Sequence, residues 1–394
     1  MKEGFFKYQG QTTPHPLAIE IASANGSYIY TTDGKKMLDF VAGVSANSLG
    51  HNHPKINKAI KNQLDSYTHV MVYGEFIQKP QLELCKALAN TLPNTLSSIY
   101  LVNSGTEATE GALKLAKRFR NRSEIIAAKN AYHGNTQGAM SVCGAEQQNR
   151  AFRPLIPGTK FIEFNNDIDL EKITKNTAGV ILETIQGGAG FIEPKNNYLT
   201  KVKKRCQEVG ALFILDEIQT GVGRTGKFWG FENYNVTPDI VITGKGLGGG
   251  MPIGAFISSF EIINTLKENP KLGHITTFGG HPVIAAAGLA TINEITSTKL
   301  IEETLRKEKL VRNKFKNHPA VKEIRGRGLM LALIVESPEI ASQIILNSLN
   351  KGLILFWLLF EGTAIRITPP LTISDKEITQ GCDIILSELD KFLK

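Results

Sequence analysis

Short apolar segments recur between residues 98 and 260 with helical stretches between them, and this alternation constrains the fold more than any other feature of the sequence. The segments read SIYLV, EIIAA, KFIEF, AGVILETI, ALFILDEI, PDIVIT and IGAFISS. They are nearly continuously hydrophobic, which is typical of strands buried on both faces of a mostly parallel sheet. Because helical stretches separate them, we predict an α/β fold whose large domain contains such a sheet.

The rest of the chain divides around this region. A chain of 394 residues is too long for one simple core, which favours one large and one smaller domain. A helical section rich in Lys and Glu reaches about Phe315, and an α+β unit follows it, with a helix near 337–349 and a last helix from about Asp375. The first 50 residues, with a hairpin predicted around Asp33-Gly34, are expected to pack with this unit. We predict an N-terminal segment 1–50, a large domain 51–290 and a small domain 291–394.

Composition argues against several classes of protein. Lys and Arg exceed Asp and Glu by 8, but they are scattered without interleaved aromatics, so we expect solvated helix faces and no nucleic-acid partner. The 4 cysteines form no C-x-x-C pair, which argues against structural zinc and suits a cytoplasmic location. The longest apolar run, Leu353 to Phe360, predicts a buried strand paired with TAIRITPPL and no membrane span.

An acid and a lysine follow two of the predicted strands. Asp216 ends the run ALFILDEI, and open α/β sheets bind ligands at the carboxyl ends of their strands. Lys245 follows PDIVIT in the glycine-rich turn GKGLGGG. Such a lysine can form a Schiff base with an aldehyde cofactor, and an acid opposite can keep a pyridine nitrogen protonated. Taken alone, the acid is as consistent with a helix cap and the lysine with a surface turn.

A candidate phosphate site opens the helix after the strand SIYLV. Ser104, Gly105 and Thr106 begin this helix, whose free N–H groups attract an anion. The same pattern is consistent with a simple helix cap, with acidic residues in the first turns. Nearby, Tyr132 in NAYHG offers a flat surface for stacking on an aromatic ring, although an aromatic residue after a strand is more often part of a core.

A second lysine motif resembles a nucleotide-binding loop. The segment from Gly221 to Lys227 fits G-x-x-x-x-G-K, but Phe228 follows where a P-loop has Ser or Thr to ligate Mg²⁺. The GLGGG turn likewise lacks a G-x-G-x-x-G that opens a βαβ unit. The alternative of a P-loop or dinucleotide-binding protein is therefore disfavoured.

Six motifs together resemble those of the class III, pyridoxal-phosphate-dependent aminotransferases. They are most similar to the branch of acetylornithine and 4-aminobutyrate aminotransferases. The resemblance implies fold type I, pyridoxal 5'-phosphate as cofactor, and ping-pong transfer of an amino group from an amino acid or ω-amine donor to a 2-oxo acid, 2-oxoglutarate or pyruvate. It also implies a homodimer with shared active sites, and leaves an aminomutase or decarboxylase as the alternative. The motifs, in the family's order, are GHNHP, NSGTEATEGALKLAKR, AYHG, LFILDEIQTGVGRTGK, DIVITGKGLGGGMPIGAF and TTFGGHP.

The same resemblance implies roles for residues around the cofactor ring. Lys245 would hold the cofactor as a Schiff base and move a proton between the substrate and the cofactor. Asp216 would pair with the ring nitrogen, and Gln219 would hydrogen-bond the phenolic oxygen. Ile218 would pack under the ring and Tyr132 over it.

Further roles concern the cofactor phosphate and the substrate. The phosphate would be bound by Ser104, Gly105 and Thr106, with Thr277 reaching across from the other subunit. Arg366, in AIRITPP, matches the family's arginine that grips a substrate carboxylate. An arginine on a half-buried strand is also consistent with a side chain that extends to water.

Three positions depart from the family pattern. Asn135, in HGNT, replaces the arginine that commonly holds the far carboxylate, and Gly188, in QGGAG, replaces the glutamate that pairs with the arginine equivalent to Arg366. Without that glutamate, Arg366 is expected to stay available, so we hypothesise a donor range shifted away from strict acetylornithine or 4-aminobutyrate specificity. Val44 stands where ornithine-specific members have tyrosine, which argues against ornithine, although a single apolar residue also suits simple packing.

Overall fold

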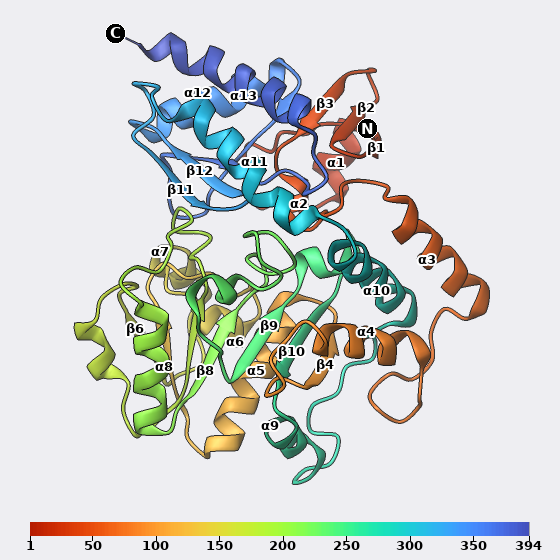
Figure 1. Ribbon diagram of the computed structural model, residues 1–394, viewed down its shortest axis with the longest axis vertical. Coiled ribbons are helices and arrows are strands. Elements are labelled where there is room, and N and C mark those ends of the chain that lie inside the picture. Colours follow the sequence, from red (N-terminus) through yellow and green to blue (C-terminus); the bar gives the residue numbers. More distant parts are fainter. Residues whose placement is uncertain (394) are drawn as a thin grey trace.

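The apolar segments form a seven-stranded sheet in the computed structural model, which describes residues 1–393 (Figure 1). The strand order is β4-β10-β9-β8-β7-β5-β6. β10 runs antiparallel to both of its neighbours, and the other pairs are parallel, so the predicted mostly parallel α/β sheet is confirmed. The strands are β4 (Ser98–Val102), β5 (Glu124–Ala128), β6 (Thr159–Ile162), β7 (Thr177–Glu183), β8 (Leu212–Asp216), β9 (Ile240–Thr243) and β10 (Gly254–Ser258).

Both faces of this sheet are buried, which explains why its strands are hydrophobic at every position. In β8, Leu212 and Ile214 belong to one apolar cluster, whereas Phe213 and Leu215 belong to another. The first cluster includes the apolar face of α5 (Gly105–Arg120). The second includes residues of α4 (Lys79–Ala89), α8 (Tyr198–Val209) and α10 (Pro282–Thr296).

Two four-stranded sheets lie above the large sheet in Figure 1. The first has the order β1-β2-β3-β13 and joins the two ends of the chain, because β13 pairs in parallel with β3. The predicted hairpin is present between β2 and β3. The second sheet has the order β11-β12-β15-β14. Their strands are β1 (Ile21–Asn25), β2 (Tyr28–Thr31), β3 (Lys36–Asp39), β11 (Glu323–Arg327), β12 (Met330–Ile334), β13 (Leu353–Ile354), β14 (Phe356–Trp357) and β15 (Ala364–Ile367).

The helices of the C-terminal part begin close to their predicted positions. Ser337 and Ser374 cap α12 (Pro338–Asn350) and α13 (Asp375–Leu389), because each side-chain oxygen accepts a hydrogen bond from a backbone N–H in the first turn. No helix among residues 1–393 is long and apolar enough to cross a membrane. The remaining helices are α1 (Lys2–Tyr8), α2 (Ala42–Ser45), α3 (Pro54–Ser66), α6 (Gln137–Ser141), α7 (Glu146–Asn149), α9 (Phe260–Asn264) and α11 (Leu300–Phe315).

The prediction of one buried strand over residues 353–360 is wrong, although its predicted pairing with the segment TAIRITPPL is confirmed at Phe356 and Trp357. The chain pairs with β3 at Leu353 and Ile354, and then changes sheets and pairs with β15 at Phe356 and Trp357. Beyond this point Leu359 is 55% exposed and lies outside any strand. The apolar run is therefore divided between two sheets and a loop, and Phe356, Trp357 and Leu359 line a cavity while Leu358 remains in a core cluster.

The segment that resembles a P-loop is a packed turn under the C-terminal part of the chain. Arg224 is buried and donates hydrogen bonds to the carbonyl oxygens of Leu329 (3.0 Å) and Pro369 (2.5 Å). Gly226 has a φ of +81°, and a Cβ there would collide with Leu305. The glycines of this turn therefore permit close packing of protein against protein.

The close fit of α5 on the sheet gives a testable stability effect. A Cβ on Gly111 would overlap the ring of Phe256 in β10. We therefore expect Gly111→Ala to lower the free energy of unfolding by about 1–3 kcal/mol, because overpacking outweighs alanine's better helix propensity. Gly4→Ala is the matched control, since no atom of the described residues lies within 4 Å of its Cβ position in α1. Urea unfolding measures both variants, and a Gly111→Ala protein as stable as the wild type would contradict this packing.

Candidate active site

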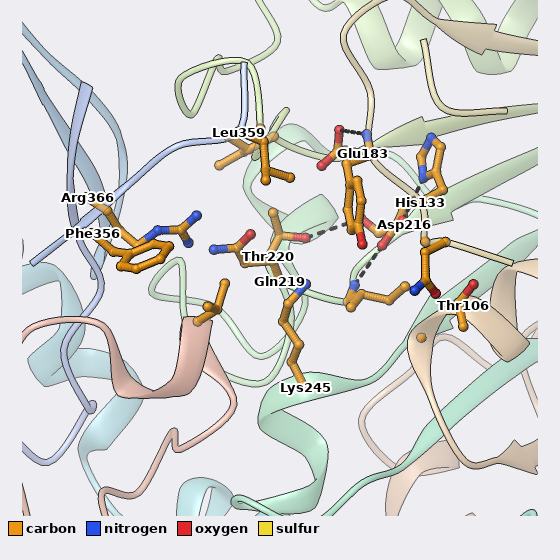
Figure 2. A pocket seen from close by; sticks show the side chains of 18 of the residues that line it. Thr106, His133, Glu183, Asp216, Gln219, Thr220, Lys245, Phe356, Leu359 and Arg366 are labelled. Atoms are coloured by element: carbon orange, nitrogen blue, oxygen red, sulfur yellow. Dashed lines mark hydrogen bonds and ion pairs between the residues drawn. The ribbon is translucent and has the colours of Figure 1, made fainter. Parts of the chain in front are cut away.

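A cavity of about 410 Å³ lies at the carboxyl ends of the large sheet's strands, between that sheet and the β14–β15 pair. Figure 2 shows Thr106 at one end of the cavity, Arg366 and Phe356 at the other, and Lys245 between them. The residues that line it follow β4, β5, β7, β8 and β9, and the C-terminal strands close the far side. The cavity therefore occupies the edge where open α/β sheets bind ligands.

The structure brings together most of the residues singled out in the sequence. Ser104 lies next to the cavity, and its hydroxyl caps α5 by accepting a hydrogen bond from Glu107 N at 3.3 Å. Thr277 is exposed, and it is not among the described residues that line the cavity of its own chain. The predicted residues that do line it are Val44, Gly105, Thr106, Tyr132, Asn135, Gly188, Asp216, Ile218, Gln219, Lys245 and Arg366.

The carboxylate of Asp216 is held in one orientation at the end of β8. Its Oδ2 lies 2.7 Å from Nδ1 of His133, and its Oδ1 accepts a hydrogen bond from Ile218 N at 2.9 Å. Asp216 and His133 are both buried. Sequence reasoning missed His133, although it directly follows Tyr132 in a motif that was recognised. Because both oxygens have a partner, the carboxylate is preorganised to face a cationic group in the cavity.

Lys245 lies in a short 3₁₀ turn after β9, with a φ of +40°. This left-handed conformation is uncommon for a residue with a side chain, and such conformations cluster at functional sites. Burial lowers the pKa of Lys245 below the usual 10.5, and the carboxylates of Asp216 and Glu183 oppose that shift. The fraction of Lys245 that is present as the neutral, nucleophilic amine is therefore larger than for a lysine in water.

Glu183 is a second acid in the cavity that sequence reasoning missed. It ends β7 and lies beside Asp216 in the register of β7 and β8. Its carboxylate accepts hydrogen bonds from Gly187 N (3.0 Å) and Tyr132 N (3.2 Å). Burial raises its pKa to about 7, and the negative charge of Asp216 adds to the shift. A signal was available, because Glu183 ends an apolar run just as Asp216 does.

The N-terminus of α5 forms an open cradle for an anion. Thr106 Oγ1 lies 2.8 Å from Thr136 Oγ1, so the hydroxyl is fixed beside the first turn. A Cβ on Gly105 would lie 2.7 Å from Ile218 Cδ1, and a Cβ on Gly134 would collide with Thr106. Glycine at these two positions permits the close approach of Ile218 and Thr106 to the backbone beside the cradle. The cradle fits a phosphate group, which the positive end of the helix dipole stabilises.

The middle of the cavity has flat and apolar walls. Tyr132 and Ile218 both line it, and Gln219 donates a weak hydrogen bond to Ser45 Oγ at 3.4 Å. Val44 faces the cavity from α2 with a φ of +58°, a costly conformation for a β-branched residue. These side chains leave a space whose shape suits a planar ring between the two polar ends.

A buried guanidinium occupies the end of the cavity opposite Thr106 (Figure 2). Arg366 is 5% exposed in β15, and its centre lies 5.6 Å from the ring centroid of Phe191. Within residues 1–393, its Nε and Nη1 atoms have no hydrogen-bond partner. Burial lowers its pKa to about 10, so it remains charged at neutral pH. A buried cation with free donors is a site for an anionic ligand.

Gly188 cannot carry a larger side chain without rearrangement of its neighbours. A Cβ there would lie 2.8 Å from the ring of Phe360, whose backbone N–H donates to the Gly188 carbonyl at 2.9 Å. Phe360 therefore fills the space into which a side chain at residue 188 would extend. Phe356, Trp357 and Leu359 line the same end. Sequence reasoning missed these three residues because it assigned their apolar run to a buried strand.

Comparison with known proteins agrees with this geometry. The family model for class-III aminotransferases matches residues 9–389. The acetylornithine aminotransferase of Caldanaerobacter subterraneus is 39% identical over 94% of this chain and 95% of its own length. A [LysW]-aminoadipate semialdehyde/glutamate semialdehyde transaminase of Sulfolobus acidocaldarius is 34% identical over 95% of both chains. Among solved structures, adenosylmethionine-8-amino-7-oxononanoate aminotransferase of Methanocaldococcus jannaschii superimposes with a TM-score of 0.91 at 30% identity, over 99% of this chain and 98% of its own. The chain therefore belongs to the class-III aminotransferases, a family of pyridoxal-phosphate-dependent enzymes, as its motifs predicted.

Proposed function

We propose that this aminotransferase moves an amino group from an amino acid or ω-amine donor to a 2-oxo acid, 2-oxoglutarate or pyruvate, by a ping-pong mechanism. One observation carries the proposal: Lys245, Asp216 and the open N-terminus of α5 converge on one cavity with the free donors of Arg366 at its other end. An amine, an acid, a phosphate cradle and a carboxylate site are the groups that the reaction requires.

Pyridoxal 5'-phosphate, when bound, supplies a conjugated ring that withdraws electrons from the substrate carbon. Gly105 and Thr106 would hold the phosphate, and Asp216 would face the ring nitrogen and keep it protonated. Tyr132 and Ile218 would cover the two faces of the ring. The long distance between Gln219 and Ser45, 3.4 Å, supports a role for the Gln219 amide as a donor to the phenolic oxygen instead.

Lys245 would form the covalent link to the cofactor and then act as the general base. Its lowered pKa supports both roles, because only the neutral amine attacks an aldehyde or accepts a proton. Its position between Asp216 and the far end of the cavity places the amine within the space that a substrate carbon must occupy (Figure 2).

Arg366 would bind the substrate carboxylate in both half-reactions, or that of the acceptor alone if the donor is an uncharged amine. This is supported by its free donors and by Phe360, which occupies the space where a carboxylate on residue 188 would lie. The neutral Asn135 and the apolar Val44 line the same cavity. We therefore propose a donor range distinct from strict acetylornithine, 4-aminobutyrate or ornithine specificity.

We also propose a homodimer in which Thr277 contributes to the partner's phosphate site. The support is the exposed apolar side chain next to Thr277, because Phe278 is 53% exposed. The ring of Phe278 lies 4.9 Å from that of His69, so a residue far away in the chain contributes to the same surface. A surface of this kind typically marks a protein–protein interface.

The division of the chain into residues 1–50, 51–290 and 291–394 is a further proposal. It is supported by the parallel pairing of β3 with β13, which attaches the N-terminal segment to the C-terminal part. A cytoplasmic location is supported by the four cysteines, all of which are free thiols.

The function is tested by single-turnover absorbance measurements on the holoenzyme. Each donor is mixed with the enzyme, and loss of the visible cofactor band reports the first half-reaction. An α-amino acid, a terminal diamine and 4-aminobutyrate represent three donor classes, and acetylornithine is the reference. Bleaching by at least one donor, reversed by a 2-oxo acid, is expected. Efficient turnover of acetylornithine or 4-aminobutyrate alone would contradict the proposed donor range.

The charge of Glu183 is expected to contribute to the pH dependence of cofactor incorporation. The Glu183 carboxylate raises the pKa of Lys245, so Glu183→Gln should lower that pKa further. Because the neutral amine reacts, the acid limb of the rate of cofactor incorporation into apoenzyme should move to lower pH. Below about pH 7 Glu183 is itself protonated, so the two proteins should converge there. Stopped-flow measurements from pH 6 to 10 test this, with Glu183→Asp as the charge-conserving control; a shift in the opposite direction would contradict it.

A further inference from the structure

We infer that the cavity is built for substrates with a single carboxylate and an apolar remainder, so that 2-oxo monocarboxylates are better amino acceptors than 2-oxo dicarboxylates. The inference rests on the proposed function and names the substrate class of the same site. The reaction exchanges an amino group and a hydrogen for an oxygen between two substrates, so atoms and electrons balance without another reagent.

The first observation is the distribution of charge among the residues that line the cavity. Among the described residues that line the cavity, the cationic side chains are Lys245 and Arg366, while His133 pairs with Asp216. Lys245 is committed to the cofactor, so one guanidinium remains for the substrate. A second substrate carboxylate would find no further cationic side chain among these residues, and it would lack a counter-charge.

The second observation is that the guanidinium of Arg366 is permanently available to a substrate carboxylate. Its Nε and Nη1 atoms have no partner in the part of the chain that is described, and no side chain at residue 188 can approach it, because Phe360 fills that space. The site therefore presents one fixed anion-binding position that does not depend on a movable carboxylate. Both half-reactions would use it for the carboxylate adjacent to the reacting carbon.

The third observation is the apolar wall of the cavity near Arg366. Phe356 and Leu359 line the cavity although they are 41% and 55% exposed, so they present apolar surface that the core does not use. They lie at the Arg366 end, and Val44, Ile185 and Trp357 extend the apolar lining. A substrate held by its carboxylate at Arg366 would place its chain along these side chains, where a methyl end is favoured and a charged end is not.

Matched five-carbon acids test the inference. The amino form of the holoenzyme, which has already taken the amino group from a donor, is mixed with 2-oxopentanoate or 2-oxoglutarate. These two acids differ only in the terminal methyl and carboxylate groups. We expect kcat/KM to favour 2-oxopentanoate by about 10-fold or more, as a carboxylate without a partner is excluded. In parallel, the affinities of the unreactive acids pentanoate and glutarate for the resting holoenzyme are measured by calorimetry, and pentanoate should bind more tightly. Equal or better values for the dicarboxylates would overturn the inference.

Asn135 provides a gain-of-charge variant. It is exposed and lines the cavity, so Asn135→Arg adds a second cation without disturbing a buried contact. This variant should raise the ratio of 2-oxoglutarate to 2-oxopentanoate turnover by about 10-fold or more. Asn135→Gln adds length without charge and should not reproduce that shift; if it does, bulk and not charge controls the preference and the inference fails. If neither oxo acid reacts with the amino form, the proposed function fails, while the binding of pentanoate and glutarate still decides the inference.

Discussion

Replacement of Lys245 with alanine is expected to lower kcat by about 10⁴-fold, the upper end of what a positioned general base contributes. The variant loses the nucleophile that links the cofactor and the base that moves the substrate proton. Because Lys245 lies in a short turn with a positive φ and not in a strand, the fold should persist. Steady-state turnover with the best donor, and the unfolding midpoint of the same preparation, measure the two effects separately.

Lys227 is the matched control for this experiment. It is exposed at the end of the G-x-x-x-x-G-K segment, in a turn that packs under the C-terminal part of the chain. Lys227→Ala should therefore retain wild-type turnover. If Lys245→Ala kept more than a tenth of the activity, or if Lys227→Ala lost it, the assignment of the working lysine would be refuted.

Asp216→Asn should lower kcat by about 10²–10³-fold, which is the usual effect of removing one preorganised electrostatic partner. The neutral amide cannot balance a protonated ring nitrogen, so the ring becomes a weaker electron acceptor. The amide also has a single acceptor oxygen where the carboxylate contacts both His133 Nδ1 and Ile218 N. The substitution is nearly isosteric, and it should therefore leave the unfolding midpoint close to that of the wild type.

A split between kcat and KM distinguishes this electrostatic role from a structural one. If Asp216 acts on the ring nitrogen, the variant should bind cofactor and donor while kcat falls. Asp216→Glu, which keeps the charge on a longer side chain, should recover part of the rate. Unchanged kcat in Asp216→Asn, or a fall in activity that only follows a loss of folded protein, would contradict the role.

The ends of strands and the starts of helices were predictable from the sequence because residues that are close in the chain determine them. Asp216 and Lys245 each follow an apolar run, and the carboxyl ends of those strands lie at one edge of the sheet. Two C-terminal helices were predicted near residue 337 and from about Asp375, close to where α12 and α13 begin. Such signals depend on neighbours within a few residues, so no knowledge of tertiary packing was needed.

The change of sheet after Ile354 was not readable from the sequence. An apolar run of this length predicts a strand whether it stays in one sheet or divides between two. The division places Phe356 and Leu359 at the cavity, and it depends on the pairing of β13 with β3, more than 300 residues away in the chain. Long-range pairing of this kind leaves no local pattern.

The site itself was only partly predictable. The roles of motif residues such as Tyr132 and Gln219 were implied by the resemblance to the family, whereas Glu183 and His133 were missed because a single acid or histidine has many structural roles. For Gly188, the sequence indicated which side chain is missing but not what replaces it. The structure identifies Phe360 as the residue that fills the space.

The central claim is that Lys245 carries the cofactor, and borohydride reduction of the purified holoenzyme tests it most directly. Reduction converts the link between the amine and the aldehyde into a stable bond, and peptide mass spectrometry then locates the pyridoxyl group. We expect this group on the peptide that contains Lys245 and on no other lysine peptide. A reduced protein without the adduct, or with the adduct on Lys227, would contradict it.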